Sequence, residues 1–143
     1  MQRYSKNTVA LQQKVESYIE KHQLLTKKEP IIVALSGGAD SIALLHILLS
    51  LGYPCIAAHC NFHLRSEESN LDEYFVRKHC VSIDIPLHII DFDTVKYSKD
   101  NNISIEMAAR DLRYEWFYQL LEKESAQAIA VAHHADDNIE TLL

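Results

Sequence analysis

The segment of this sequence best suited to phosphate chemistry is a short polar stretch between two apolar ones. The apolar run 31–35 predicts a buried strand, and the apolar residues after position 41 predict a helix. Two of the three glycines of the chain are adjacent in between, and glycine permits positive φ and close approach of the backbone to a ligand. The free N–H groups and positive dipole end of the helix would face that ligand, which favours an anion such as phosphate. The stretch consists of Ser36, Gly37, Gly38, Ala39, Asp40 and Ser41.

This stretch differs from the two common phosphate loops of nucleotide-binding proteins. No lysine follows the glycines, as it does in GxxxxGK[ST] loops, and the spacing is not GxGxxG. The usual contact of that lysine to the β- and γ-phosphates is therefore missing. A plain Gly-Gly turn, in which Asp40 and Ser41 only cap the helix, is the alternative interpretation.

A second cluster of titratable residues, at positions 133–141, follows another apolar run. Asp137 and Glu140 have the spacing of a capping box, and two adjacent histidines can simply end a strand. Histidine and aspartate could also hold a divalent ion, although successive strand residues point to opposite faces, which counts against a shared metal. In a third interpretation, His133 or His134 transfers a proton near neutral pH.

A third candidate group lies on a long predicted helix that begins near Ser104. Glu106, Arg110 and Arg113 fall within a narrow arc of this helix, beside its apolar stripe. They could form a solvated row of ion pairs, each worth about a few tenths of a kcal/mol. Alternatively, the arginines reach the edge of a cleft and neutralise phosphate or nucleotide charge.

The hydrophobic pattern predicts strands alternating with helices around these candidates. Continuous apolar strands indicate a mostly parallel sheet covered on both faces, which is an α/β, doubly wound, Rossmann-like fold. Such sheets bind ligands at the carboxyl ends of their strands, where residues 36–41, 59–65 and 133–140 all follow a strand. Strands are expected at 31–35, 53–59, 86–90 and 128–132. Helices are expected near 7–24, 41–51, 69–83, 104–120 and from about 137, with a loop at 91–102. We expect Gly52 to end the second helix and Ser69 to cap the third.

Length and composition limit the classes of protein to which this chain can belong. The 143 residues predict one domain, and no apolar run approaches the ~20 residues of a membrane helix. A net charge of -6 without a basic stripe counts against a domain that binds nucleic acid alone. Cys55, Cys60 and Cys80 form no CxxC pair, and their odd number does not suit a set of disulfides. We therefore expect free thiols in the core of a cytoplasmic protein. The last residues carry no helix stop signal, which predicts truncation at the C-terminal side.

Residues 36–41 resemble the pyrophosphate loop of the PP-loop ATPases, within the adenine nucleotide α-hydrolase-like group. In that family the loop holds the β- and γ-phosphates of ATP, and cleavage between the α- and β-phosphates yields an adenylated substrate. The absent lysine fits this chemistry because the γ-phosphate is not the group transferred. The resemblance implies that residues 36–41 bind ATP, and that Asp40 approaches the phosphates through Mg²⁺, which favours carboxylate and phosphate oxygens.

Three more segments resemble PP-loop enzymes that modify tRNA cytidines. Residues 133–141 resemble their HHxDDxxET motif, and residues 105–114 resemble the ExAARxLRY pattern of the tRNA(Ile)-lysidine synthetase family. Residues 59–69 resemble the HVNHGLRGEES segment of that family, with Phe62 and His63 replacing a His-Gly pair. A thiolating enzyme would be expected to carry CxxC sulfur chemistry near 105–114, where this chain has no cysteine.

The resemblance to this family implies a two-step reaction on the wobble cytidine of tRNA(Ile). ATP adenylates the C2 oxygen and releases pyrophosphate, and the amine of free L-lysine then attacks C2 and expels AMP. The implied catalytic residues are Asp40, Arg110, Arg113, His133 and Asp137. The implied nucleotide-binding residues are the six of the loop and His59, and the implied substrate contacts are Asn61, Arg65, Glu106 and Glu140.

Residues 1–143 are accordingly interpreted as a PP-loop ATP-binding catalytic domain that lacks its tRNA-binding domains. Most tRNA contacts would come from those domains, no membrane partner is expected, and homodimer formation stays open. The alternatives are another PP-loop tRNA-modifying enzyme, such as a 2-thiocytidine synthetase, or a nucleotide-binding module without catalytic activity.

Overall fold

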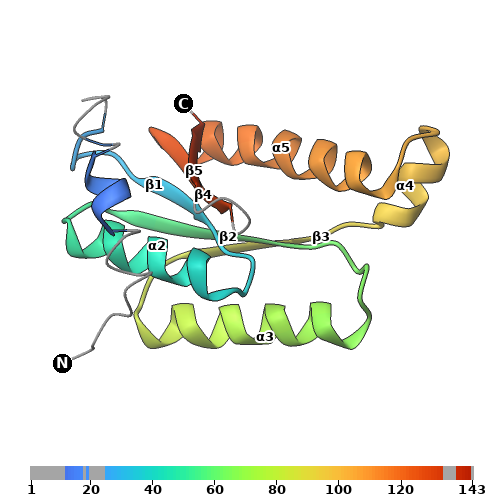
Figure 1. The fold of residues 1–143 in the computed structure, drawn as a ribbon, viewed down its shortest axis with the longest axis horizontal. Helices are drawn as coiled ribbons and strands as arrows, with labels where there is room; N and C mark the ends of the chain where they lie inside the picture. Colours follow the sequence, from blue (N-terminus) through green and yellow to red (C-terminus); the bar gives the residue numbers. More distant parts are fainter. Residues whose placement is uncertain (1–11, 18, 20–24, 134–137, 143) are drawn as a thin grey trace.

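A computed structural model describes residues 12–17, 19, 25–133 and 138–142 (Figure 1). The alternation of strands and helices that the hydrophobic pattern predicts is present from residue 31 to residue 133. Residues 12–17 are helical, within the span where the first helix is expected. The other elements are β1 (Ile31–Ala34), α2 (Ala39–Ser50), β2 (Cys55–Asn61), α3 (Glu67–Ser82), β3 (Leu87–Asp91), α4 (Thr94–Asp100), α5 (Ile105–Lys123), β4 (Ala128–His133) and β5 (Asn138–Leu142).

The strands form one sheet in the order β3-β2-β1-β4-β5. β1 lies in the middle and pairs in parallel with β2 and β4, while β2 pairs in parallel with β3. The chain moves outward from β1 to β3 and then crosses to β4 on the other side, so the switch point lies between β1 and β4. The predicted doubly wound, Rossmann-like parallel sheet is confirmed.

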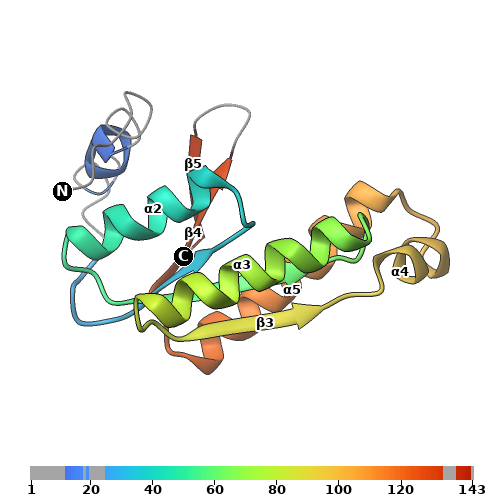
Figure 2. The ribbon, with the colours of Figure 1, turned by 90° about the horizontal axis from the view of Figure 1, so that it is seen from below.

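β1 to β4 contribute side chains to two hydrophobic cores, because successive side chains point to opposite faces of a sheet. Ile31 and Ala57 belong to the core under α2 and α3, whereas Ile32 and Phe117 belong to the core under α5. Figures 1 and 2 show α2 and α3 on one face of the sheet and α5 on the other. Along β2, odd-numbered residues therefore face α2 and α3, and even-numbered residues face α5.

Residues 94–100 form α4, so the prediction of a loop over 91–102 was wrong in this part. Asp93 caps the helix by accepting a hydrogen bond from the Lys96 N–H at 3.2 Å. The buried Thr94 hydroxyl donates to the Phe62 carbonyl at 2.8 Å and ties the helix to the segment after β2. These polar contacts hold a short helix that has too few apolar residues to show a helical stripe.

Residues 138–142 form β5, antiparallel to β4, so the prediction of a helix from about residue 137 was wrong. The register pairs Ile129 with Leu142 and Ala132 with Ile139. Such a short segment gains little from a helix, because the first turn is costly to nucleate. Pairing instead satisfies the backbone groups at the edge of β4, and Ile139 and Thr141 are β-branched residues that favour strands.

Two helix-end predictions have different outcomes. Gly52 follows the end of α2 with φ of +92°, as expected for a C-terminal glycine. Ser69 does not cap α3, because that helix begins at Glu67 with Ser66 at its N-cap. The Ser69 hydroxyl instead accepts a hydrogen bond from the Arg65 N–H at 3.3 Å, one turn into the helix.

The start of α5 is fixed by Ser104, whose hydroxyl accepts a hydrogen bond from the Met107 N–H at 3.1 Å. Ser104→Ala is expected to lower the free energy of unfolding by about 1 kcal/mol, because it removes this cap. Urea denaturation at an unchanged m-value measures the loss. Ser66→Ala is the matched control, since Ser66 occupies the N-cap of α3 but makes no side-chain cap bond in the described structure. Equal losses from the two variants would contradict the prediction.

Candidate functional site

The carboxyl ends of β1 and β2 lie side by side at one edge of the sheet and bring two predicted segments together. Residues 36–41 follow β1, and His59 and Asn61 lie at the end of β2. Arg113 of α5 reaches the same edge, because it lines a cavity together with Ser36 and Ser41. Three segments that are distant in sequence thus meet there, as the fold class predicts.

The phosphate loop, residues 36–41, is braced by its two serine hydroxyls. The Ser41 hydroxyl accepts a hydrogen bond from the Ser36 N–H at 3.2 Å and donates one to the Gly38 carbonyl at 3.0 Å. The Ser36 hydroxyl accepts from the Gly38 N–H at 3.2 Å. α2 begins at Ala39, and Asp40 lies in its first turn, so the N-terminal end of that helix lies directly after the glycines. This arrangement suits an anion.

The α5-side cavity, of about 160 Å³, opens beside the phosphate loop on the face of the sheet that α5 covers. The loop and β2 form one wall, and α5 forms another. Its lining includes Ser36, Ser41, Cys60, Phe62, Arg113 and Phe117.

Arg113 carries the positive charge of this cavity. Its Nε is buried and has no hydrogen-bond partner within the part of the chain that the structure describes. The guanidinium groups of Arg113 and Arg110 each lie 5.1 Å from the centroid of the Tyr114 ring, which orients both of them. None of the ion pairs between described residues joins Glu106 to either arginine, so the solvated row of ion pairs does not form there. Arg110 is exposed, and Arg113 is the arginine that faces the loop.

Cys60 also lines the α5-side cavity, whereas Cys55 and Cys80 are buried core thiols as expected. Burial raises the pKa of the Cys60 thiol to about 12, and the charge of Arg113 lowers it by a smaller amount. The thiol therefore stays protonated at neutral pH and is a poor nucleophile. This cysteine does not supply the thiolate that sulfur transfer needs.

The α3-side cleft, of about 280 Å³, lies on the opposite face of the same edge, toward α3. His59, Asn61 and Arg65, all predicted site residues, line it together with Ser36. Ser36, Cys60 and Phe62 line both the cleft and the α5-side cavity, so the two spaces adjoin.

Asp72 is a residue of this edge that sequence reasoning missed. It projects from α3 against the phosphate loop: a Cβ added at Gly37 would lie 3.0 Å from the Cβ of Asp72. Its carboxylate also lies 3.5 Å from the Arg65 guanidinium. Asp72 follows other acidic residues on a helix with an exposed polar face, so no pattern distinguishes it from a solvated acid.

Glu106 is not among the residues that line the α5-side cavity or the α3-side cleft. Glu106 is exposed in the first turn of α5. His133 ends β4 and Glu140 lies on β5, where the register pairs Glu140 with Val131. Asp137 lies outside the described residues. Within the described ranges, no group of three or more His, Cys, Asp or Glu side chains is arranged to hold a metal ion.

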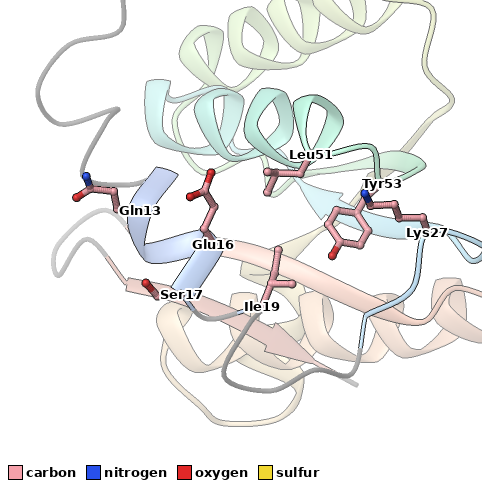
Figure 3. A pocket seen from close by; sticks show the side chains of 7 residues that line it. All are labelled: Gln13, Glu16, Ser17, Ile19, Lys27, Leu51 and Tyr53. Carbon is pink, nitrogen blue, oxygen red and sulfur yellow. The ribbon is translucent and has the colours of Figure 1, made fainter.

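A further cavity of about 370 Å³ lies near the amino ends of the strands, away from the predicted site (Figure 3). Lys27, Leu51 and Tyr53 line one side of it, and Gln13, Glu16, Ser17 and Ile19 line the other (Figure 3).

Among the described helices, none is long and apolar enough to cross a bilayer.

A family model described as a PP-loop domain matches residues 7–143. The chain belongs to the PP-loop family. It is 57% identical over 129 residues to the tRNA(Ile)-lysidine synthase of Parabacteroides distasonis, and the match covers 90% of this chain. It is 58% identical over 133 residues to the tRNA(Ile)-lysidine synthase of Bacteroides thetaiotaomicron, with 93% of this chain covered. The chain spans 30% and 31% of the lengths of these two relatives.

The fold of the chain is also found among solved structures. The NH3-dependent NAD synthetase of Campylobacter jejuni superposes with a TM-score of 0.58 over 90% of this chain and 56% of that chain. The two sequences are 13% identical, so this likeness describes the fold alone.

Proposed function

We propose that this chain is the ATP-binding catalytic part of an enzyme that converts the wobble cytidine of tRNA(Ile) to lysidine. The observation that carries the proposal is the α5-side cavity, in which a glycine-containing phosphate loop meets the guanidinium group of Arg113. The relatives named tRNA(Ile)-lysidine synthase support this choice of reaction.

In the first step, the C2 oxygen of the cytidine attacks the α-phosphorus of ATP. A new bond from oxygen to phosphorus forms, the bond to the bridging oxygen breaks, and pyrophosphate leaves. The N–H groups of the phosphate loop and the dipole of α2 would stabilise the pyrophosphate as it leaves. Arg113 would balance the charge that develops at the α-phosphate, a role suited to a planar guanidinium group.

In the second step, the lysine amine attacks C2, the bond from C2 to the oxygen breaks, and AMP leaves. The amine must be neutral to attack, so a nearby group has to accept its proton. Asp137, with His133, is predicted to steer or deprotonate the amine. Glu106 and Glu140 are predicted substrate contacts.

Asp40 is the residue that would hold Mg²⁺. It lies directly after the glycines, in the first turn of α2, and is half-buried. A carboxylate beside a phosphate site is the kind of hard oxygen ligand that Mg²⁺ prefers. When bound, Mg²⁺ would offset the negative charge of the phosphates.

The tRNA would be held mainly by protein outside these residues, because the net charge of the chain is -6 and phosphate contacts need lysine and arginine. A segment rich in lysine and arginine elsewhere in the protein would be consistent with this expectation about tRNA binding.

We also predict a cytoplasmic location, and whether the protein forms a homodimer stays open.

The enzyme, at the length of its relatives, is expected to release pyrophosphate from ATP in the presence of tRNA(Ile). With L-lysine added, it is expected to release AMP and to leave lysidine in the tRNA. Mass spectrometry of the digested tRNA measures the nucleoside, and a coupled assay measures pyrophosphate. A reaction without tRNA is the control.

Two other outcomes would contradict the proposal. Formation of 2-thiocytidine with a sulfur donor, and no lysidine with lysine, would identify a thiolating PP-loop enzyme. Binding of ATP without release of pyrophosphate would identify a module that binds a nucleotide without transforming it.

A further inference from the structure

Two histidines from different helices form a hydrogen-bonded pair. The Nε2 atoms of His46 on α2 and His79 on α3 lie 2.8 Å apart, and both side chains are half-buried. The ring centroids are 5.0 Å apart, and the ring planes cross at 78°. Phe75 stacks on the His79 ring at 5.9 Å between centroids and fixes its orientation. The pair therefore links α2 directly to α3.

The same two helices also meet at the phosphate loop. α2 begins at Ala39, where the loop ends, and Asp72 of α3 lies against Gly37 of the loop. His46 lies about two turns beyond Ala39, and His79 lies about two turns beyond Asp72. α2 and α3 cover the same face of the sheet (Figures 1 and 2). A change at the histidine pair would therefore shift the start of α2 relative to Asp72, because each helix moves as a rigid rod.

The number of hydrogens on the pair decides whether its bond exists. A neutral imidazole has one N–H and one bare nitrogen, so one Nε2 donates and the other accepts. A first added proton can occupy Nδ1 of the donating ring, and the bond is kept. A second proton places a hydrogen on both Nε2 atoms, which leaves no acceptor and puts two positive charges side by side. The doubly protonated pair cannot hold the helices together.

The environment of His46 opposes its protonation. Burial lowers the pKa of His46, and the charge of His79 lowers it further. The unfolded chain binds the proton with the ordinary pKa of about 6.5. Since the unfolded state takes up the proton more readily, the stability that the neutral pair contributes is complete above about pH 6.5 and is lost as the pH falls below it.

Other ionisable groups on the surrounding elements do not account for this behaviour. Cys55 and Cys80 stay protonated, because burial raises the pKa of both thiols. Among the described residues, His79 is the one charged group that shifts the pKa of His46. The remaining ionisable side chains on these elements are Lys14 and Glu16 in the helical residues 12–17, Asp40 on α2, Glu67, Glu68, Asp72, Glu73, Tyr74, Arg77 and Lys78 on α3, His59 on the inner face of β2 and Asp91 on β3.

We propose that the His46–His79 pair positions the phosphate loop by holding α2 against α3, and that protonation of both rings at acidic pH releases the loop. The inference rests on the proposed function, because it gives the loop a pH-dependent affinity for ATP. Both histidines are positioning residues, since neither lines the α5-side cavity or the α3-side cleft. A released loop binds ATP more weakly, because a small displacement costs most of the alignment of its phosphate contacts.

His46→Gln in the full-length enzyme separates the pH response from the contact itself. The glutamine oxygen accepts from the Nε2–H of His79 in both protonation states of that ring, and glutamine carries no charge. The KM for ATP is measured from tRNA-dependent pyrophosphate release without lysine. From about pH 7.5 to about pH 5.5, the ratio of the wild-type KM to that of the variant is expected to rise by up to about 10-fold, the factor that corresponds to a difference of one in pKa. This ratio cancels the titration of ATP and of the residues that the two enzymes share.

Urea denaturation at the same two pH values gives a readout that does not depend on activity. The wild type should lose more stability on acidification than His46→Gln, because only the wild type loses the bond. His79→Phe keeps an aromatic ring on Phe75 but removes the bond at every pH, so its KM for ATP should already be raised near neutral pH.

His88→Gln is the matched control. His88 bonds to Glu124 of α5 at 2.8 Å, on the face of the sheet opposite α2 and α3. This variant is expected to keep the acid-induced rise in the KM for ATP that the wild type shows.

Three results would overturn the proposal. The first is a ratio of the two KM values that stays constant or falls as the pH is lowered. The second is loss of the acid response in His88→Gln as well. The third is a difference in stability between wild type and His46→Gln without a difference in KM, which would make the pair structural only. An enzyme that releases no pyrophosphate at any pH would instead refute the proposed function, and urea denaturation would still report on the pair.

Discussion

Replacing Arg113 with alanine is expected to slow tRNA-dependent pyrophosphate release by about 10²–10³-fold, the usual effect of removing one group that stabilises a transition-state charge. Arg113 lines the α5-side cavity with Ser36 and Ser41, and its buried Nε has no partner among the described residues. Within the described ranges, this Nε–H is therefore available to a ligand. Single-turnover release of pyrophosphate in the full-length enzyme, without lysine, measures the effect on the first step directly.

The same variant should fold normally. It loses a cation–π contact with Tyr114 of about 0.5–1 kcal/mol, but it also removes a buried donor without a partner. Thermal melting should therefore stay close to that of the wild type. A large fall in melting temperature would attribute the lost activity to unfolding instead.

Arg110→Ala is the matched control, because Arg110 contacts the same Tyr114 ring at the same distance of 5.1 Å but is exposed. It is expected to lose less activity than Arg113→Ala. An equal or larger loss would transfer the proposed role in adenylation from Arg113 to Arg110. Arg113→Lys should recover only part of the rate, since an ammonium group keeps the charge but not the planar pair of donors.

Replacing Gly37 with alanine is expected to raise the KM for ATP at least about 10-fold, because a phosphate loop displaced by even 1 Å loses most of its alignment. Gly37 has φ of +92°, a conformation that disfavours any residue with a Cβ. The added Cβ would also lie 3.0 Å from the Asp72 Cβ. Both effects act on the loop that is proposed to hold the pyrophosphate. The KM for ATP in pyrophosphate release is the measurement.

Gly52→Ala separates backbone strain from loop displacement. Gly52 has the same φ of +92°, but the atoms nearest to its added Cβ would belong to the flexible Lys27 side chain, at 3.6 Å. Both variants are expected to lose stability, by about 1–2 kcal/mol of left-handed strain. Only Gly37→Ala should weaken ATP binding. Weaker ATP binding in Gly52→Ala, or an unchanged KM in Gly37→Ala, would contradict the prediction.

The hydrophobic pattern was sufficient to predict β1 to β4 and the helices α2, α3 and α5. These elements bury apolar residues at regular spacing, so their period is visible in the sequence. α4 and β5 were mispredicted because other forces hold them. The Asp93 cap and the Thr94 bond to the Phe62 carbonyl fix α4, and pairing with β4 fixes β5.

The candidate site also has a part that the sequence predicted and a part that it did not. The phosphate loop could be predicted because its glycines, serines and aspartate are consecutive in sequence. The sequence predicted that Glu106, Arg110 and Arg113 lie together on one side of a helix. It left open which of the two arginines faces the α5-side cavity. Asp72 gave no signal, because a carboxylate on a polar helix face resembles any solvated acid until a neighbouring segment is placed against it.

By itself, the sequence determined the fold class, the phosphate loop and the family resemblance, because strand burial, glycine conformation and helix starts depend on residues close together in the chain. Only the tertiary structure decided which side chains share a space. It placed Arg113 rather than Arg110 in the cavity with Ser36, and Asp72 against Gly37. It also left His59 Nε2 without a partner among the described residues. Such contacts depend on the packing of separate helices across a sheet edge, which no local pattern of residues encodes.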